Sequence, residues 1–116
     1  MKPGTSKPPR AQNFPRRGEV FWVALDPTVG REIRKTRPAL VVSPDEMNRS
    51  LGTVVLAPIT SAVRDFPTRY TIRLQRKIAS VALDQIRTVS VERLLKRITT
   101  VDPAPALAIL REMFAV

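Results

Sequence analysis

Residues 16–44 read RRGEVFWVALDPTVGREIRKTRPALVVSP. The run Val20–Leu25 is apolar and rich in aromatic and β-branched residues, which predicts a strand that Asp26-Pro27 ends. Ala39–Val42 predicts a second strand that begins at Pro38, because a proline at the first residue of a strand loses no interior ladder bond. The loop between the two strands is rich in cations. We therefore expect a rigid β scaffold that presents positive charge at its strand ends.

The rest of the chain continues this pattern of short strands. We expect a helical turn at 44–48, a short helix from Ser90 to about Leu95 and a packing helix after Asp102-Pro103. Together the elements predict a mainly β fold, a small and mostly antiparallel barrel of five or six strands with a C-terminal helix. Further strands are predicted at Thr53–Pro58 and Tyr70–Leu74. Ser80–Leu83 and Gln85–Val89 predict either two short strands or one bent strand with a kink near Asp84.

Composition narrows the possible functions. The chain has 116 residues, enough for one domain, and its 20 Lys and Arg against 10 Asp and Glu give a net charge of +10. Such a charge favours nucleic acid as the partner, ahead of an acidic protein or an anionic membrane. The chain has no cysteine and no histidine, which removes most metal sites, the Ser-His-Asp arrangement and the commonest general base. We expect no cofactor and no bound metal.

The N-terminus differs from the rest of the chain. Residues 1–16 are rich in proline and cations and contain no acid, so we expect a disordered basic tail before a domain at 17–116. The tail is either a cloning remnant or solvating segment, or an arm that touches RNA or DNA. It has no apolar core, so it is not a secretory signal, and no apolar run in the chain could span a bilayer. We expect a cytoplasmic protein.

The residue types that remain suit one reaction in particular. Cleavage of RNA by its own 2'-hydroxyl needs neither a strong protein nucleophile nor a metal. The protein must position the phosphate, neutralise its developing charge and assist proton movement. A guanidinium matches phosphate oxygens with a rigid fork of donors, and a threonine hydroxyl beside it can donate a further hydrogen bond.

Several blocks of sequence resemble the MazF/PemK (Kid) family of toxin endoribonucleases. They are RRGEVFWVALDPTVG, RPALVVSP, APITS and DQIRTVS, which follow one another over residues 16 to 116. The resemblance implies an SH3-like barrel with appended helices that works as a homodimer. It also implies metal-independent cleavage of single-stranded RNA at short motifs, leaving 2',3'-cyclic or 3'-phosphate and 5'-hydroxyl ends. An acidic antitoxin would cover the RNA groove, and operator DNA would be bound only by the toxin–antitoxin complex.

The resemblance carries over to individual residues. Arg37 of the RP step matches the catalytic arginine of the family, and Thr60 of the PITS step matches its catalytic threonine. Glu32 matches an acid of the loop, and Asp84 matches an aspartate that some members use in proton transfer, so these four are the predicted catalytic residues. The predicted RNA-binding residues are Arg31, Arg34, Lys35, Ser61, Gln85 and Arg87.

This chain departs from the family at the loop and before Asp84. Ile33-Arg34-Lys35-Thr36 stands where many members have small residues, Arg31 stands where some have histidine or serine, and Ala82 stands where some have arginine. The departures favour a mechanism centred on Arg37 and Thr60 over one centred on Asp84.

Several of the predicted site residues also have a structural interpretation. Arg37 could be a solvated arginine beside a turn, and Thr60 with Ser61 could hydrogen-bond to backbone. Glu32 could pair with Arg34 or Arg37, and Asp84 with Arg87. For Trp22 we expect packing in the core or at a dimer interface rather than stacking on a base. A binding module that acts on a protein such as gyrase, or a nucleic-acid binder without catalysis, is the alternative function.

Overall fold

The computed structural model describes residues 13–116, so most of the expected basic tail lies outside the described residues. The strands are β1 Glu19–Ala24, β2 Thr36–Val41, β3 Thr53–Thr60, β4 Arg69–Leu74, β5 Lys77–Ala82, β6 Arg87–Ser90 and β7 Leu94–Thr100. The helices are α1 Asp45–Leu51 and α2 Ala104–Met113, with short 3₁₀ turns η1 Leu83–Gln85 and η2 Val91–Arg93. None of the helices seen in this part of the chain is long and apolar enough to cross a membrane.

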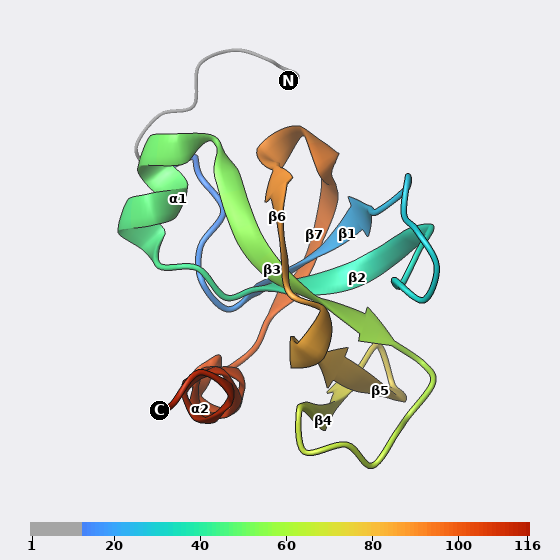
Figure 1. The fold of residues 1–116 in the computed structure, drawn as a ribbon. Coiled ribbons are helices and arrows are strands. Elements are labelled where there is room, and N and C mark those ends of the chain that lie inside the picture. Colours follow the sequence, from blue (N-terminus) through green and yellow to red (C-terminus); the bar gives the residue numbers. More distant parts are fainter. Residues whose placement is uncertain (1–12) are drawn as a thin grey trace.

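The strands form one curled antiparallel sheet. Their order is β4-β5-β3-β2-β1-β7, and β6 pairs separately with β3. Strand β3 crosses the centre of the fold (Figure 1), where its first part pairs with β2 and β6 and its last two residues pair with β5. This half-barrel with a C-terminal helix confirms the mainly β, antiparallel fold class predicted from the sequence.

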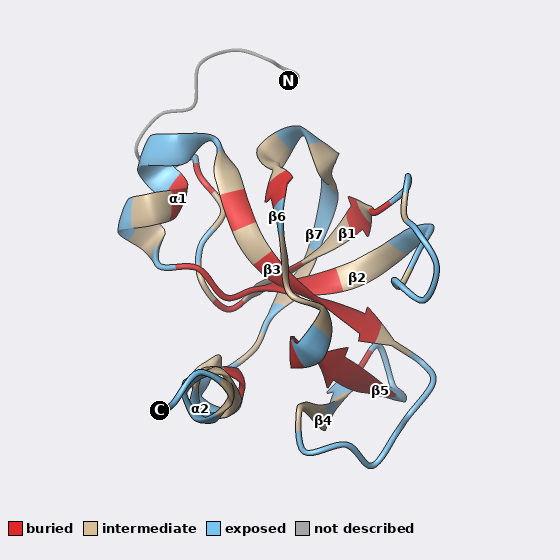
Figure 2. Ribbon diagram, viewed as in Figure 1, coloured by how far each residue is buried: buried red, intermediate tan, exposed pale blue. Residues whose placement is uncertain are grey.

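The buried apolar side chains form two clusters, which take alternate residues of the central strands. One contains Val20, Leu40 and Ile59, against which α2 packs through Ala106. The other contains Val23, Ala39 and Leu56. Buried residues concentrate in the central strands, whereas the loops and helix surfaces are exposed (Figure 2). Because side chains of a strand alternate between faces, the two clusters lie on opposite faces of the sheet.

Strand β2 begins earlier, and strand β3 ends later, than the sequence predicts. β2 begins at Thr36, so Pro38 is its third residue and not its first. At Pro38 the strand is paired with Trp22 of β1, and the ladder to β3 starts only at Ala39, so the missing N–H breaks no bond to β3. β3 continues to Thr60, two residues beyond its predicted end.

The segment after Ser90 was predicted as a helix, and that prediction is wrong in part. The Ser90 hydroxyl does accept a hydrogen bond from the Glu92 N–H at 3.2 Å, but the helical turn η2 stops at Arg93. Strand β7 follows and pairs with β1. Its sequence, LLKRITT, does not predict a strand, because apolar and charged residues do not alternate strictly along it.

The packed part of the chain starts before Arg17, where we placed the domain boundary. Phe14 is buried, and the guanidinium carbons of Arg16 and Arg49 lie 4.4 and 5.4 Å from the centre of its ring. The Asn48 amide also donates to the Pro15 carbonyl at 3.0 Å. The segment 13–16 is therefore attached to α1.

Candidate active site

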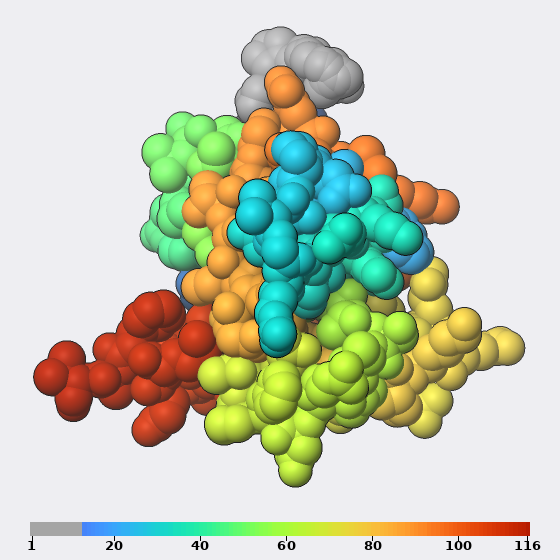
Figure 3. Space-filling view, turned by 45° about the vertical axis from the view of Figure 1, so that its right-hand side comes forward, coloured from blue at the N-terminus to red at the C-terminus, as the bar shows by residue number. Residues whose placement is uncertain are grey.

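An open cleft of about 630 Å³ lies between the loop that follows β1 and the turn η1. In the space-filling view the cyan loop stands forward of the orange atoms of β6 and reaches toward the yellow-green segment after β3 (Figure 3). Of the residues that the structure describes, the following line the cleft: Pro27, Arg31, Glu32, Ile33, Pro58, Asp84, Gln85, Ile86 and Arg87. Five of the ten predicted site residues are among them, so the fold brings the loop and the DQ step together.

Arg37 and Thr60 are not part of this lining, but they stand next to it. The ladder pairs Ala39 with Pro58, and Pro58 lines the cleft. Beyond this pair the strands diverge: Arg37 of β2 pairs with Val23 of β1, and Thr60 of β3 pairs with Ser80 of β5. Alternation along each strand still puts Arg37 on the face of Ala39 and Thr60 on the face of Pro58. The two predicted catalytic residues therefore stand on one face beside the cleft.

Arg37 offers free donors there. It is half-buried, and its Nε donates to the Arg34 carbonyl at 3.2 Å. Among residues 13–116, its guanidinium makes no other hydrogen bond and no ion pair. A cation whose terminal nitrogens are not used by the fold is available to an anionic ligand.

The Thr60 hydroxyl is arranged in a similar way. Its Oγ1 accepts a hydrogen bond from the Ala62 N–H at 3.2 Å, which leaves the hydroxyl hydrogen able to donate. Ser61 follows the strand and is exposed. Thr60 therefore does hydrogen-bond to the backbone, as its structural interpretation predicts. This contact orients the hydroxyl and leaves its hydrogen free to donate to a ligand.

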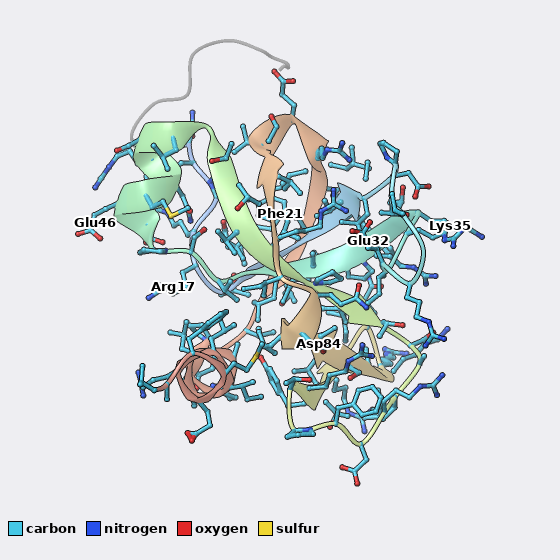
Figure 4. All side chains as sticks on the ribbon, in the orientation of Figure 1. Arg17, Phe21, Glu32, Lys35, Glu46 and Asp84 are labelled. Atoms are coloured by element: carbon cyan, nitrogen blue, oxygen red, sulfur yellow. The ribbon has the colours of Figure 1, made fainter. Side chains whose placement is uncertain are left out.

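The loop 27–35 carries the acid and most of the cations. Glu32 accepts a hydrogen bond from the Val29 N–H at 2.7 Å, and within the described part of the chain it forms no ion pair with Arg34 or Arg37. Arg31, Arg34 and Lys35 are exposed (Figure 4 shows Lys35 at the outer edge of the loop). Cations therefore outnumber acids on this side of the cleft.

Asp84 forms an ion pair with Arg69 and not with Arg87, the partner considered from the sequence. Its Oδ1 accepts from the Arg69 Nε at 2.9 Å and from the Thr68 hydroxyl at 3.1 Å, and its Oδ2 accepts from the Arg69 Nη2 at 3.0 Å. The hydrogen bonds from Arg69 chiefly hold the pKa of Asp84 below its ordinary value of 3.8. The carboxylate is therefore a weak base at neutral pH.

This ion pair predicts how stability depends on pH. Because the pKa of Asp84 is lowered on folding, its contribution is complete above 3.8, the unfolded-state value, and is lost as the pH falls through the folded-state pKa. Wild type should be more stable than Asp84→Asn at about pH 6, and the difference should shrink at about pH 2.5. Urea midpoints at the two pH values measure this. A difference that stays constant would show that the ion pair does not stabilise the fold.

Gln85 and Arg87 contact the backbone around the loop. The Gln85 Oε1 accepts from the Ile33 N–H at 2.8 Å, and its Nε2 donates to the Arg31 carbonyl at 3.4 Å. Arg87 donates through Nη1 to the Leu25 carbonyl at 3.0 Å. Arg87 keeps further donors, whereas both polar atoms of Gln85 are engaged.

Sequence reasoning missed two arginines that build the site. Arg69 holds Asp84, and Arg93 donates through Nη1 to the carbonyls of Ala24 at 3.0 Å and Asp26 at 2.7 Å. Each lies far along the chain from its partner, so no local pattern indicates the contact. Among residues 13–116, no group of three or more acidic side chains is placed to hold a metal ion.

Fold and site together define a class of protein. A small curled sheet presents unpaired cations and a hydroxyl at its strand ends beside an open cleft, which is an arrangement for binding a phosphate-bearing ligand. Comparison with known proteins then specifies the family. Residues 16–113 match the model of the PemK-like, MazF-like toxins of type II toxin–antitoxin systems.

Individual relatives agree with this match. Endoribonuclease EndoA of Bacillus subtilis is 36% identical over 93 residues, which cover 75% of this chain and 80% of that protein. A crystal structure of MazF from Deinococcus radiodurans has a TM-score of 0.71 at 30% identity, covering 85% of this chain and 91% of that chain. A MazE–MazF crystal structure from the same organism has a TM-score of 0.66 at 28% identity, with coverage of 85% and 91%. The chain belongs to the PemK/MazF toxin family.

Proposed function

We propose that this chain is a sequence-specific endoribonuclease toxin that cleaves single-stranded RNA without a metal ion. The observation that carries the proposal is the placement of Arg37 and Thr60 on one face at the ends of β2 and β3, in a chain of this family. The endoribonuclease activity of the relative EndoA supports the same reaction class. The 2'-hydroxyl of the RNA attacks the adjacent phosphorus, the 5'-oxygen leaves, and a 2',3'-cyclic phosphate forms.

Arg37 and Thr60 act on the phosphate. The terminal nitrogens of Arg37 donate to the non-bridging oxygens and stabilise the pentacoordinate phosphorus, and Arg37 delivers a proton to the departing 5'-oxygen. The Thr60 hydroxyl holds a phosphate oxygen. Both groups are fixed by backbone contacts, Arg37 to the Arg34 carbonyl and Thr60 to the Ala62 N–H, so little reorganisation is needed during the reaction.

Glu32 is the better candidate for removing the 2'-hydroxyl proton. One of its oxygens accepts the Val29 N–H, and it lines the cleft without an ion-pair partner among residues 13–116. Asp84 also lines the cleft, but both of its oxygens are hydrogen-bonded to Arg69 and its pKa is lowered by that contact. In Figure 4 the labelled Glu32 lies on the loop and Asp84 on the turn below it.

The remaining charge guides the RNA backbone. Arg31 and Arg87 line the cleft, while Arg34, Lys35 and Ser61 are exposed in the loops that follow β1 and β3. Cations that neutralise phosphates release counterions, so binding should weaken steeply with salt.

Family membership also suggests partners. We propose a homodimer as the working form, and an acidic antitoxin that competes for the same cationic face. Operator DNA would be bound only by the toxin–antitoxin complex, and the site of action would be the cytoplasm, where mRNA is found. Sedimentation tests the dimer. An acidic protein encoded beside this chain should inhibit it with strong salt dependence, and failure to inhibit would contradict the antitoxin.

Cleavage of a long single-stranded RNA in excess EDTA tests the function. We expect discrete cuts, because none of the proposed steps uses a metal. The downstream fragments should carry 5'-hydroxyl ends, which polynucleotide kinase labels without prior phosphatase treatment. Cuts that vanish in EDTA would contradict the metal-independent mechanism. RNA bound but left intact would favour the alternative, a non-catalytic binder, and direct the search to a protein target such as gyrase.

A further inference from the structure

Gln85 connects the turn η1 to the loop on the other side of the cleft. Its carbonyl oxygen accepts from the Ile33 N–H at 2.8 Å, and its amide nitrogen donates to the Arg31 carbonyl at 3.4 Å. We infer that Gln85 is a positioning residue that holds the loop 27–35 against η1. This inference rests on the proposed function and assigns Gln85 a task other than the RNA contact predicted from the sequence.

The turn that carries Gln85 is itself held firmly. Leu83 is fully buried, and its N–H donates to the Thr68 carbonyl at 3.1 Å. Asp84 is fixed by Arg69, whose side chain is only 10% exposed, and by the Thr68 hydroxyl. A side chain that projects from such a turn loses little conformational entropy when it binds the loop, so it is a good anchor.

The start and the end of the loop are held by other groups. Arg93 and Arg87 donate to the carbonyls of Ala24, Leu25 and Asp26 at the end of β1. The Asp26 carboxylate accepts from the Lys35 N–H at 3.1 Å, and the Leu25 N–H donates to the Lys35 carbonyl at 3.0 Å. These contacts close the base of the loop but do not reach its middle.

Gln85 supplies hydrogen bonds to the middle of the loop. Among residues 13–116, the other hydrogen bonds of residues 28–34 stay within the loop or its base, or come from the neighbouring Arg37. Gln85 supplies those that cross the cleft, and they flank Glu32 on both sides in the sequence. The Ile33 side chain also packs against the apolar cluster that contains Val23. Gln85 therefore acts together with this packing to set the position of the proposed base and of Arg31 over the cleft.

Amide hydrogen exchange of the full-length protein without RNA tests the inference. In Gln85→Leu, the Ile33 amide should exchange about tenfold faster, because it loses its acceptor, while the amides of Val41 and Leu56 in the core keep wild-type rates. Gln85→Glu retains an acceptor oxygen and should restore most of the protection at Ile33. Thr88→Val is the matched control, since Thr88 is exposed on β6 and makes no side-chain hydrogen bond in the described part of the chain.

Cleavage of a randomised RNA separates positioning from base reading. Gln85→Leu should lower kcat/KM about tenfold and keep the cleavage motif, because a displaced loop weakens the catalytic arrangement without altering which base is read. Unchanged exchange at Ile33 in Gln85→Leu overturns the inference, as does a relaxed motif or an unaltered cleavage rate. If the wild type cleaves no RNA, the proposed function fails, while the exchange result still decides whether Gln85 holds the loop.

Discussion

Arg37→Ala should lower kcat/KM for RNA cleavage by at least about 10³-fold. The Arg37 guanidinium can both neutralise the pentacoordinate phosphate and supply a proton to the 5'-oxygen. Within residues 13–116 the Arg37 side chain makes one hydrogen bond, from its Nε to the Arg34 carbonyl, so its removal should leave the structure intact. Single-turnover cleavage of a short RNA that contains the mapped motif measures the loss.

Two further variants show whether the effect belongs to the guanidinium. Arg37→Lys keeps the positive charge but loses the fork of donors, so its rate should lie between those of the wild type and Arg37→Ala. Arg111→Ala removes the same charge from the exposed end of α2 and should cleave at the wild-type rate. An Arg37→Ala protein that cleaves within tenfold of the wild type would refute the mechanism.

The positions of Arg37 and Thr60 at strand ends can be predicted from the local sequence pattern. Val20–Leu25 and the RP step define two neighbouring strands, and a period of two places Arg37 on the face of Ala39. The same reasoning places Thr60 on the face of Pro58. The sequence therefore predicts both residues at strand ends, although it understates how far β2 and β3 extend toward the site.

The contacts that hold Asp84 and Gln85 were not predictable in this way. Asp84 meets Arg69 because β4 pairs with β5 in a register that brings Arg69 opposite Ala82, and one sequence does not fix that register. Gln85 meets Ile33 across 52 positions of the chain. Both residues were identified from a short motif, which indicates where they lie but not which neighbours use their polar atoms.

The missed strand β7 has a related cause. It is an edge strand beside β1, and its exposed side chains, such as Leu95, Lys96 and Arg97, give no alternation that separates a strand from a helix. Tertiary pairing with β1 decides its conformation. Its assignment matters for the site, because the turn before β7 delivers Arg93 to the carbonyls at the start of the loop.

Thr60→Val should lower kcat for RNA cleavage by about 10²-fold, with a much smaller change in KM. Valine keeps the branched shape that suits the end of β3, so the substitution removes the hydroxyl and little else. The Ala62 N–H loses its acceptor, but Ala62 is exposed and water can replace the contact. A drop in kcat with KM preserved would identify a hydrogen bond that forms chiefly in the transition state, which is what a donor to a phosphate oxygen of growing charge should provide.

Serine and a second threonine supply the controls for this hydroxyl. Thr60→Ser retains the acceptor for Ala62 and the free donor, so it should stay within a few-fold of the wild type. Thr99→Val makes the same chemical change on β7, opposite Val20 of β1 and away from the residues that line the cleft, and should have no effect on cleavage. If Thr60→Val and Thr60→Ser were equally impaired, the loss would come from the packing of the side chain at the end of β3. If Thr60→Val were fully active, the hydroxyl would have no part in stabilising the charge of the phosphate.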